Sequence, residues 1–255
     1  MKKFFAGILV LLFVFFVFRP DFADAASTTV DGRTGKVSVY LSTNDQGLFK
    51  FEVRRGNQVR HYDVFKGKNQ FNLTYGNGDY TFTLYRSTDG NRYKVQSRHE
   101  ESVRLSHSTA PYLHSTQNVS IDSATASLAK TLSRSSYSST QQALVTSRHL
   151  NKTISYDYKK LEKLSTTYLP NNATTLKTKR GICYDFASLN AALLRKQGIP
   201  TRLVMGTVKG VKGYHAWNEV YVDKKWRILD VTRDVTEKRA TAFRTASDYR
   251  TDTIY

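Results

Sequence analysis

Three residues in the C-terminal half of the chain are of the types that carry out nucleophilic chemistry. Cys183 is the single cysteine, so no disulfide can form within the chain. His215 and Asp230 lie further on, in the stretch GYHAWNEVYVDKKWRILDVT, residues 213–232. A thiol beside an imidazole that a carboxylate orients can attack a carbonyl carbon. The alternatives are a buried apolar thiol, a packed strand histidine and an aspartate that caps a turn.

The residues that follow Cys183 predict a helix. Apolar side chains recur at helical spacing, and a Gly-Ile-Pro sequence beginning at Gly198 ends the helix. Cys183 falls in its first turn, where free N–H groups and the positive end of the helix dipole favour a thiolate. The stretch TRLVMG, residues 201–206, then predicts a buried strand.

A β-hairpin is predicted from His215 to Asp230. A two-residue turn at Asp223 and Lys224 pairs Tyr221 with Trp226. With this register Asp230 shares a face with His215 as its diagonal neighbour, roughly 7–8 Å away at the backbone. A shift by one residue would place Asp230 on the opposite face. The predicted hairpin therefore supplies a base and an orienting acid.

Four linked motifs in this region resemble the transglutaminase-like superfamily. They are Gly-x-Cys-x-Asp-Phe-Ala around Cys183, Gly-Ile-Pro-x-Arg from Gly198, His-Ala-Trp-Asn-Glu-Val from His215, and a Trp four residues before Asp230 with a Thr two residues beyond it. The resemblance is dense from Arg180 to Thr232. It implies a papain-like fold with the nucleophile on a helix and the other two groups on a neighbouring sheet.

The resemblance also implies roles and a reaction. Cys183 would be the nucleophile, His215 the base and Asp230 the orienting acid of a cysteine protease or amidase that cleaves peptide or isopeptide bonds. Tyr156, in the stretch ISYDY, is a candidate second oxyanion donor beside the Cys183 N–H. The alternatives are a cross-linking transglutaminase and a non-catalytic surface-binding module. Animal transglutaminases have Gln and Trp beside the cysteine, where this chain has Ile182 and Tyr184.

The part of the chain that precedes these motifs predicts two further segments. Residues 1–25 have the basic start, apolar run and Ala-Asp-Ala site of a secretory signal peptide cut after Ala25. An uncleaved anchor is the alternative, although the apolar run is shorter than the roughly 20 residues that a bilayer span needs. Short alternating stretches separated by turn residues predict an immunoglobulin-like β-sandwich at 28–105.

The predicted organisation is an α+β protein: a papain-like transglutaminase core at 123–255, preceded by an all-β immunoglobulin-like sandwich and a linker at 106–122. Helical spacing in SATASLAKTLSR and STQQALVTSRHL marks the beginning of the core. The predicted location is secreted or associated with the cell envelope.

The composition of the chain limits the classes of binding partner that are expected. The formal net charge of +18 favours anionic surroundings such as a cell-wall polymer or a membrane surface. An ordinary solvated surface is the alternative. The chain has no recognisable nucleic-acid motif, so a nucleic-acid partner is not expected. No clustered carboxylates suggest a calcium site, and no cofactor is expected. The expected substrate is a protein or peptide.

Overall fold

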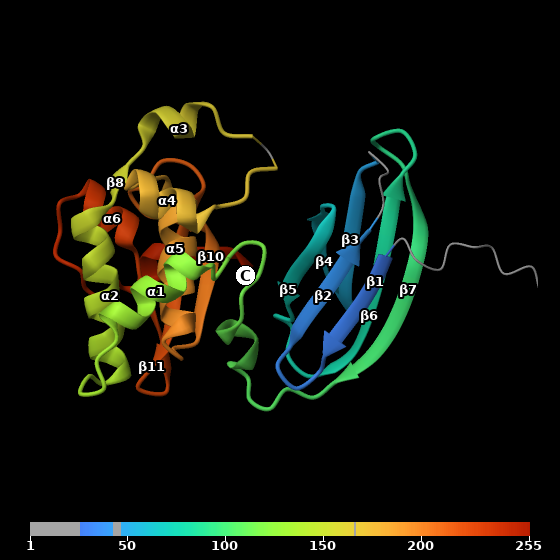
Figure 1. Cartoon of the computed structure of the whole chain (residues 1–255), viewed down its shortest axis with the longest axis horizontal. Helices are drawn as coiled ribbons and strands as arrows, with labels where there is room; N and C mark the ends of the chain where they lie inside the picture. Colours follow the sequence, from blue (N-terminus) through green and yellow to red (C-terminus); the bar gives the residue numbers. More distant parts are fainter. Residues whose placement is uncertain (1–25, 43–46, 166) are drawn as a thin grey trace, which may run out of the picture.

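The computed structural model describes residues 26–42, 47–165 and 167–255. The predicted signal peptide, residues 1–25, lies outside these ranges. Within them the chain forms two structural units that lie side by side and are joined by residues 106–122 (Figure 1). No helix in the described ranges combines the length and the apolar character needed to cross a membrane.

The N-terminal unit consists of two antiparallel sheets. One has the order β1-β2-β5, formed by Ala26–Asp31, Lys36–Leu41 and Gly67–Asn72. The other has the order β4-β3-β6-β7, formed by Gln58–Val64, Phe49–Arg55, Gly78–Ser87 and Tyr93–Val103. The alternating stretches KVSVYLS, LFKFEVR, QVRHYDVF and DYTFTLYR correspond closely to β2, β3, β4 and β6. FNLTY and RYKVQS cover only parts of β5 and β7, and no strand was expected at β1.

The two sheets share one aromatic core. The Phe51 ring of β3 stacks 5.4 Å from the Phe71 ring of β5 and 6.0 Å from the Phe82 ring of β6. All three side chains are almost completely buried. Because Phe71 belongs to the other sheet, these contacts hold the two sheets face to face and account for the alternation of apolar and polar residues in the sequence.

The C-terminal unit begins with two helices, α1 (Ser123–Leu132) and α2 (Ser139–Thr153). Both are rich in serine and threonine, which form helices poorly, and both begin at strong caps. Asp122 accepts the Thr125 N–H at 2.8 Å, and Ser138 forms a reciprocal capping box with Gln141. These caps satisfy N–H groups that would otherwise lack a partner in the first turn.

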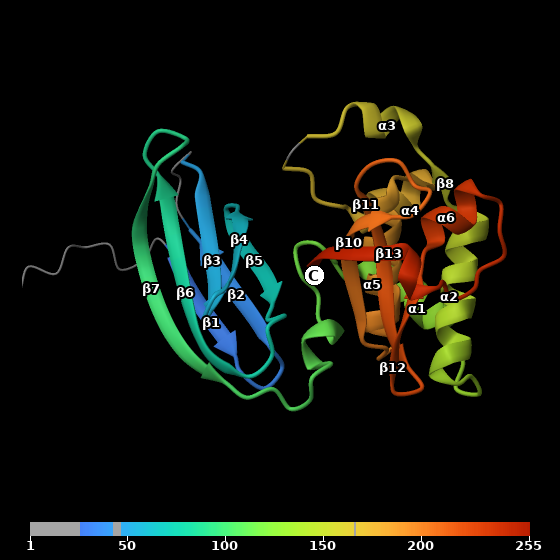
Figure 2. The same ribbon diagram turned by 180° about the vertical axis from the view of Figure 1, so that it is seen from behind.

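The central helix of this unit is α5, Cys183–Lys196, which is buried along almost its whole length. It packs on a four-stranded antiparallel sheet of order β12-β11-β10-β13, formed by Lys225–Leu229, His215–Val222, Thr201–Val208 and Tyr249–Ile254. The remaining elements are β8 (Ser155–Tyr156), α3 (Tyr158–Glu162), α4 (Asn172–Thr178), β9 (Arg180–Gly181) and α6 (Val231–Thr236). The sheet is seen from behind in Figure 2.

The predicted end of α5 and the predicted register of the hairpin are confirmed. Gly198 has φ of +80° just beyond the helix, as a left-handed C-terminal glycine requires. The β11–β12 pairing runs from Val222 opposite Lys225 to Asn218 opposite Leu229. The sequence placed Asp230 within the second strand, but β12 ends one residue earlier and Asp230 is the N-cap of α6.

The joining segment, residues 106–122, packs against both units. It contains a short 3-10 helix, η1 (Ala110–Leu113), whose Tyr112 is buried edge-on against Trp226 at 5.4 Å. The Gln117 N–H donates to the Gln70 carbonyl of β5 at 2.9 Å. A segment that is polar in sequence is thus held in place by contacts on both sides.

Candidate active site

Cys183 is the first residue of α5, as its sequence context predicted. Its side chain is partly exposed. The preceding Ile182 N–H is held by Asp185, whose Oδ2 accepts it at 2.9 Å. The thiol therefore lies at the positive end of a well-ordered helix, which favours its ionised form.

His215 and Asp230 are joined by a direct hydrogen bond, with Nε2 and Oδ2 2.9 Å apart. His215 begins β11, and Asp230 lies at the junction of β12 and α6. The side chains are buried, at 5% and 0% exposure. Because little water competes at this site, the carboxylate fixes the orientation of the imidazole ring.

His215 also contacts Cys183, and the two contacts together shift its titration. Burial alone lowers the pKa of His215, but the hydrogen bonds and negative charges of Asp230 and Cys183 outweigh burial and raise the pKa to about 9. The imidazole is therefore protonated at neutral pH. The structure thus brings Cys183, His215 and Asp230 into one hydrogen-bonded chain.

Tyr156 lies beside Cys183 because of a short parallel pairing. In the β8–β9 pair Tyr156 is opposite Gly181, and the Asp157 N–H donates to the Gly181 carbonyl at 2.9 Å. Burial and the neighbouring Cys183 raise the pKa of Tyr156 to about 12. The hydroxyl keeps its proton at neutral pH and can donate to a developing oxyanion.

Two buried asparagines fix the helix against the strand that carries His215. Asn190 of α5 donates from Nδ2 to Asn218 Oδ1 at 2.9 Å. Asn218 of β11 donates in turn to the Ala187 carbonyl at 2.9 Å. These bonds set the helix at one position along the strand, because a slip would leave buried amide groups without partners.

Sequence reasoning missed Tyr249 on β13. Its hydroxyl donates to Asp230 Oδ2 at 3.0 Å, the oxygen that His215 also uses. Its ring packs edge-on against Trp217 at 5.1 Å. The chain contains 16 tyrosines, and nothing in the local sequence of Tyr249 distinguishes it from the others.

A second missed cluster surrounds Asp185. Lys160 Nζ donates to Asp185 Oδ2 at 2.6 Å, and the Tyr168 hydroxyl donates to Oδ1. Burial and the Asp185 charge raise the pKa of Tyr168 well above its usual value. Asp185 thus both caps the N-terminus of α5 and ties α3 and Tyr168 to the start of that helix.

A model of the transglutaminase-like superfamily matches residues 126–231. No curated protein matches the chain. Among solved structures, a candidate cysteine protease from Cytophaga hutchinsonii is 15% identical over 86% of this chain and 80% of its own, with a TM-score of 0.45.

Two transglutaminases are also similar to parts of the chain. The red sea bream enzyme is 11% identical over 82% of this chain and 50% of its own, with a TM-score of 0.34. A protein described as a TGase is 21% identical over 43% of this chain and 31% of its own, with a TM-score of 0.36. The family model spans Cys183, His215 and Asp230, so residues 126–231 of the chain are similar to the transglutaminase-like superfamily.

Proposed function

We propose that the protein is a cysteine-dependent acyl-transfer enzyme, most simply a protease or amidase, with Cys183 as nucleophile, His215 as base and Asp230 as orienting acid. The observation that carries the proposal is the buried His215–Asp230 hydrogen bond of 2.9 Å, in contact with a thiol at a helix N-terminus. Members of this superfamily are typically cysteine-dependent enzymes.

The first half-reaction forms a thioester. Cys183 Sγ attacks the carbonyl carbon of an amide, and the carbonyl oxygen becomes an oxyanion that the Cys183 N–H and the Tyr156 hydroxyl stabilise. The C–N bond then breaks, and the amine leaves with the proton that His215 donates. Asp230 stabilises the imidazolium until that proton is transferred.

The second half-reaction releases the acyl group. Water attacks the thioester carbon while His215 takes its proton, the C–S bond breaks, a carboxylic acid is released, and the Cys183 thiolate and the His215 imidazolium are restored. A lysine amine in place of water would give a cross-link instead. Ile182 and Tyr184 stand where animal transglutaminases have Gln and Trp, which favours hydrolysis.

The decisive experiment is the pH dependence of Cys183 alkylation by iodoacetamide in the folded protein. We expect the folded wild type to react rapidly near neutral pH, because the protonated His215 in contact with the thiol favours attack by sulfur. The reaction should be slowest in His215→Ala and intermediate in Asp230→Asn. A thiol that reacts only after denaturation would mean that Cys183 is merely buried, and a binding module would then be the better proposal.

The reaction type is tested with an unfolded protein substrate and a fluorescent primary amine. Hydrolysis of main-chain bonds creates new amino termini, whereas cross-linking chemistry attaches the amine to the substrate. We expect new termini without incorporated amine. Cys183→Ala, which retains the fold but has no thiol, is the control for both products.

We also propose that the N-terminal unit is an immunoglobulin-like module of an exported protein. Its seven strands are divided between two facing antiparallel sheets, which supports this assignment. The net charge of +18 supports attraction to an anionic cell-wall polymer or membrane surface. Binding to anionic vesicles or wall fragments that falls steeply with added salt would support this location.

A further inference from the structure

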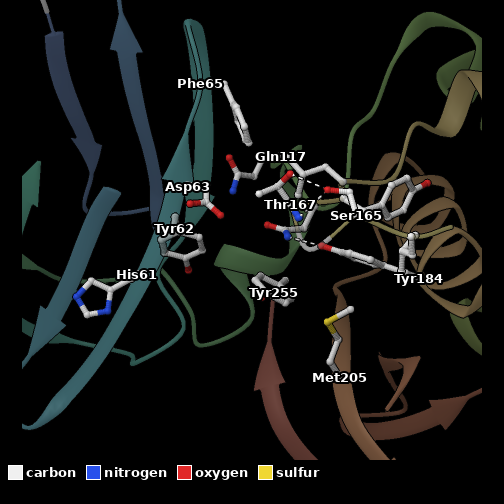
Figure 3. A pocket seen from close by; sticks show the side chains of 14 residues that line it. His61, Tyr62, Asp63, Phe65, Gln117, Ser165, Thr167, Tyr184, Met205 and Tyr255 are labelled. Atoms are coloured by element: carbon white, nitrogen blue, oxygen red, sulfur yellow. Dashed lines mark hydrogen bonds between the residues drawn. The ribbon is translucent and has the colours of Figure 1, made fainter. Parts of the chain in front are cut away.

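A cleft of about 360 Å³ lies between the two units (Figure 3). The N-terminal unit contributes His61, Tyr62 and Asp63 of β4, and Phe65 just beyond that strand. The C-terminal unit contributes Tyr184, Met205 and Tyr255, which lie across from them in Figure 3. The volume of the cleft is typical of a ligand-binding site.

The cleft adjoins the residues of the candidate active site. Tyr184 directly follows Cys183 in α5. Met205 of β10 is paired with Ala216, the residue next to His215 in β11. Tyr184, Met205 and Tyr255 pack in one cluster with Cys183. The cleft therefore lies beside residues that flank Cys183 and His215 in the chain, although neither of these two side chains is among the described residues that line it.

The side of the cleft formed by β4 is the free edge of a sheet. In the order β4-β3-β6-β7, β4 is terminal. His61, Tyr62 and Asp63 all line the cleft, although successive strand residues point to opposite faces. Three consecutive residues of a strand can all line the same cleft only if the edge of that strand faces the cleft.

The hairpin register shows which main-chain groups face outward. β3 and β4 are joined across a two-residue turn between Arg55 and Gln58. In such a hairpin the closing pair is hydrogen-bonded, and bonded pairs then alternate along the ladder. The pairs of His61 with Glu52 and of Asp63 with Lys50 are therefore non-bonded pairs. The N–H and C=O groups of His61 and Asp63 point away from β3, toward the cleft.

We propose that an extended polypeptide segment of the substrate binds in this cleft as an added strand on β4 and delivers its amide group to Cys183. The proposal rests on the proposed function of Cys183. It gives the N-terminal unit a direct part in substrate selection. Strand addition to a free edge supplies main-chain hydrogen bonds, and side-chain pockets supply selectivity.

The chemistry of the lining favours an uncharged polypeptide over an anionic polymer. Among the described residues that line the cleft there is no lysine or arginine, in a chain of net charge +18. Phe65 and Leu164 line it while 45% and 40% exposed, and apolar substrate side chains can cover them. Within the described ranges, Gln117 Oε1 is a buried acceptor without a hydrogen-bond partner, and it can accept a main-chain N–H.

The test compares two alkylating probes that carry the same reactive group. One is a single blocked amino acid whose C-terminal carboxyl group is replaced by a chloromethyl ketone. The other carries the same group at the C-terminal end of an uncharged peptide of about six residues, the length of an ordinary strand. Both transfer a carbon to Cys183 Sγ and release chloride. The ratio of their rate constants therefore measures the contribution of the extended chain alone.

Two cleft variants and two matched controls are compared with the wild type. Phe65→Ala removes apolar contact, and Tyr40→Ala removes a similarly exposed aromatic ring of β2 that does not line the cleft. Asp63→Pro removes an outward N–H from an edge strand, where proline is tolerated. Asp63→Ala keeps that N–H but removes the same carboxylate.

We expect the peptide to react faster than the single amino acid in the wild type, and the ratio to fall about fivefold or more in Phe65→Ala and Asp63→Pro. The ratio should be unchanged in Tyr40→Ala and Asp63→Ala, and iodoacetamide should alkylate all five proteins equally. An unchanged ratio in Phe65→Ala, or an equal fall in Asp63→Ala and Asp63→Pro, would overturn strand addition. A wild-type thiol inert to iodoacetamide would instead overturn the proposed function itself.

Discussion

Asp230 uses its two carboxylate oxygens for different contacts. Oδ2 accepts hydrogen bonds from His215 and Tyr249, whereas Oδ1 accepts the Arg233 N–H and caps α6. The two sequence-level alternatives for this residue, contact with His215 and capping, are therefore both present in the structure. The cap holds the carboxylate in place, and the remaining oxygen faces the imidazole.

The charge of Asp230 should govern the titration of His215. We expect a midpoint near pH 9 for the His215 imidazole in the wild type, measured by NMR and assigned by its absence in His215→Ala. In Asp230→Asn it should fall toward the ordinary value of about 6.5, while asparagine still caps α6. A wild-type midpoint near 6.5 would contradict the buried charge pair.

The titration of His215 should also change the free energy of unfolding of the protein. Because the folded-state pKa of His215 is raised to about 9, its contribution is fully present below the unfolded-state pKa of about 6.5 and is lost as pH rises through 9. The free energy of unfolding of the wild type relative to His215→Ala should therefore decrease over that interval. Urea denaturation at several pH values measures it, and a difference that is constant with pH would contradict the raised pKa.

Tyr249 should act on His215 through Asp230. Its hydroxyl donates a hydrogen bond to Asp230 Oδ2 and so weakens the interaction of that oxygen with the imidazole. Tyr249→Phe should therefore raise the titration midpoint of His215, whereas Asp230→Asn should lower it. It should also lower the free energy of unfolding by about 1 kcal/mol. A loss of stability with no change in the midpoint would mean that Tyr249 is only a packing residue.

At the scale of elements, the site depends on how closely β13 approaches β10. Gly206 lies opposite His215 in β11, and the β10–β13 register shifts between Met205 and Gly206. A Cβ at Gly206 would come within 2.0 Å of the Arg250 carbonyl oxygen and 3.0 Å of the Trp217 ring. Glycine is needed here because no side chain fits between the strands.

Gly206→Ala should therefore displace β13 and with it Tyr249. We expect a loss of about 2–3 kcal/mol in the free energy of unfolding, as for other overpacked sites, with slower alkylation of Cys183 near neutral pH. Urea denaturation and iodoacetamide labelling measure the two effects. Gly32→Ala is the matched control, since its Cβ would meet atoms no closer than 3.7 Å. Equal stability of the two variants would contradict the close approach.

At the scale of the whole molecule, the C-terminal residues connect the two units. The Arg60 guanidinium of β4 donates to the Ile254 carbonyl and lies 5.3 Å from the centre of the Tyr255 ring. Tyr255 also packs edge-on to Tyr62. Within the C-terminal unit, the Tyr255 carbonyl accepts a hydrogen bond from the buried Arg195 side chain of α5 at 3.0 Å. The width of the cleft therefore depends on residues at the end of the chain.

Arg60→Gln should loosen the two units without unfolding either. We expect a larger radius of gyration in small-angle scattering and faster proteolysis within residues 106–122, because the contact to Ile254 and the cation–π contact are both lost. Arg54→Gln is the control, since Arg54 pairs with Glu52 of its own strand. Scattering curves that coincide for the two variants would show that Arg60 does not hold the units together.

The sequence by itself determined α5, the hairpin and the residue types of the site. Helical spacing, strand alternation and the preferences of Asp223, Lys224 and Gly198 act over a few neighbouring residues, so they can be recognised without knowledge of the fold. The turn also sets the register of His215 relative to Asp230, whereas the resemblance to the transglutaminase-like superfamily added Cys183 to this pair. The roles of these residues stay predictions until they are measured.

Only the tertiary structure decided which distant residues complete the site. Asp185 and Lys160 are 25 positions apart, and Arg60 and Ile254 are 194 apart. Nothing in the sequence near Tyr249, Lys160 or Arg60 distinguishes them from the many other tyrosines and basic residues. Such contacts arise from the packing of whole elements and units. The cleft also depends on tertiary structure, because it forms only where the free edge of β4 in one unit faces the beginning of α5 in the other.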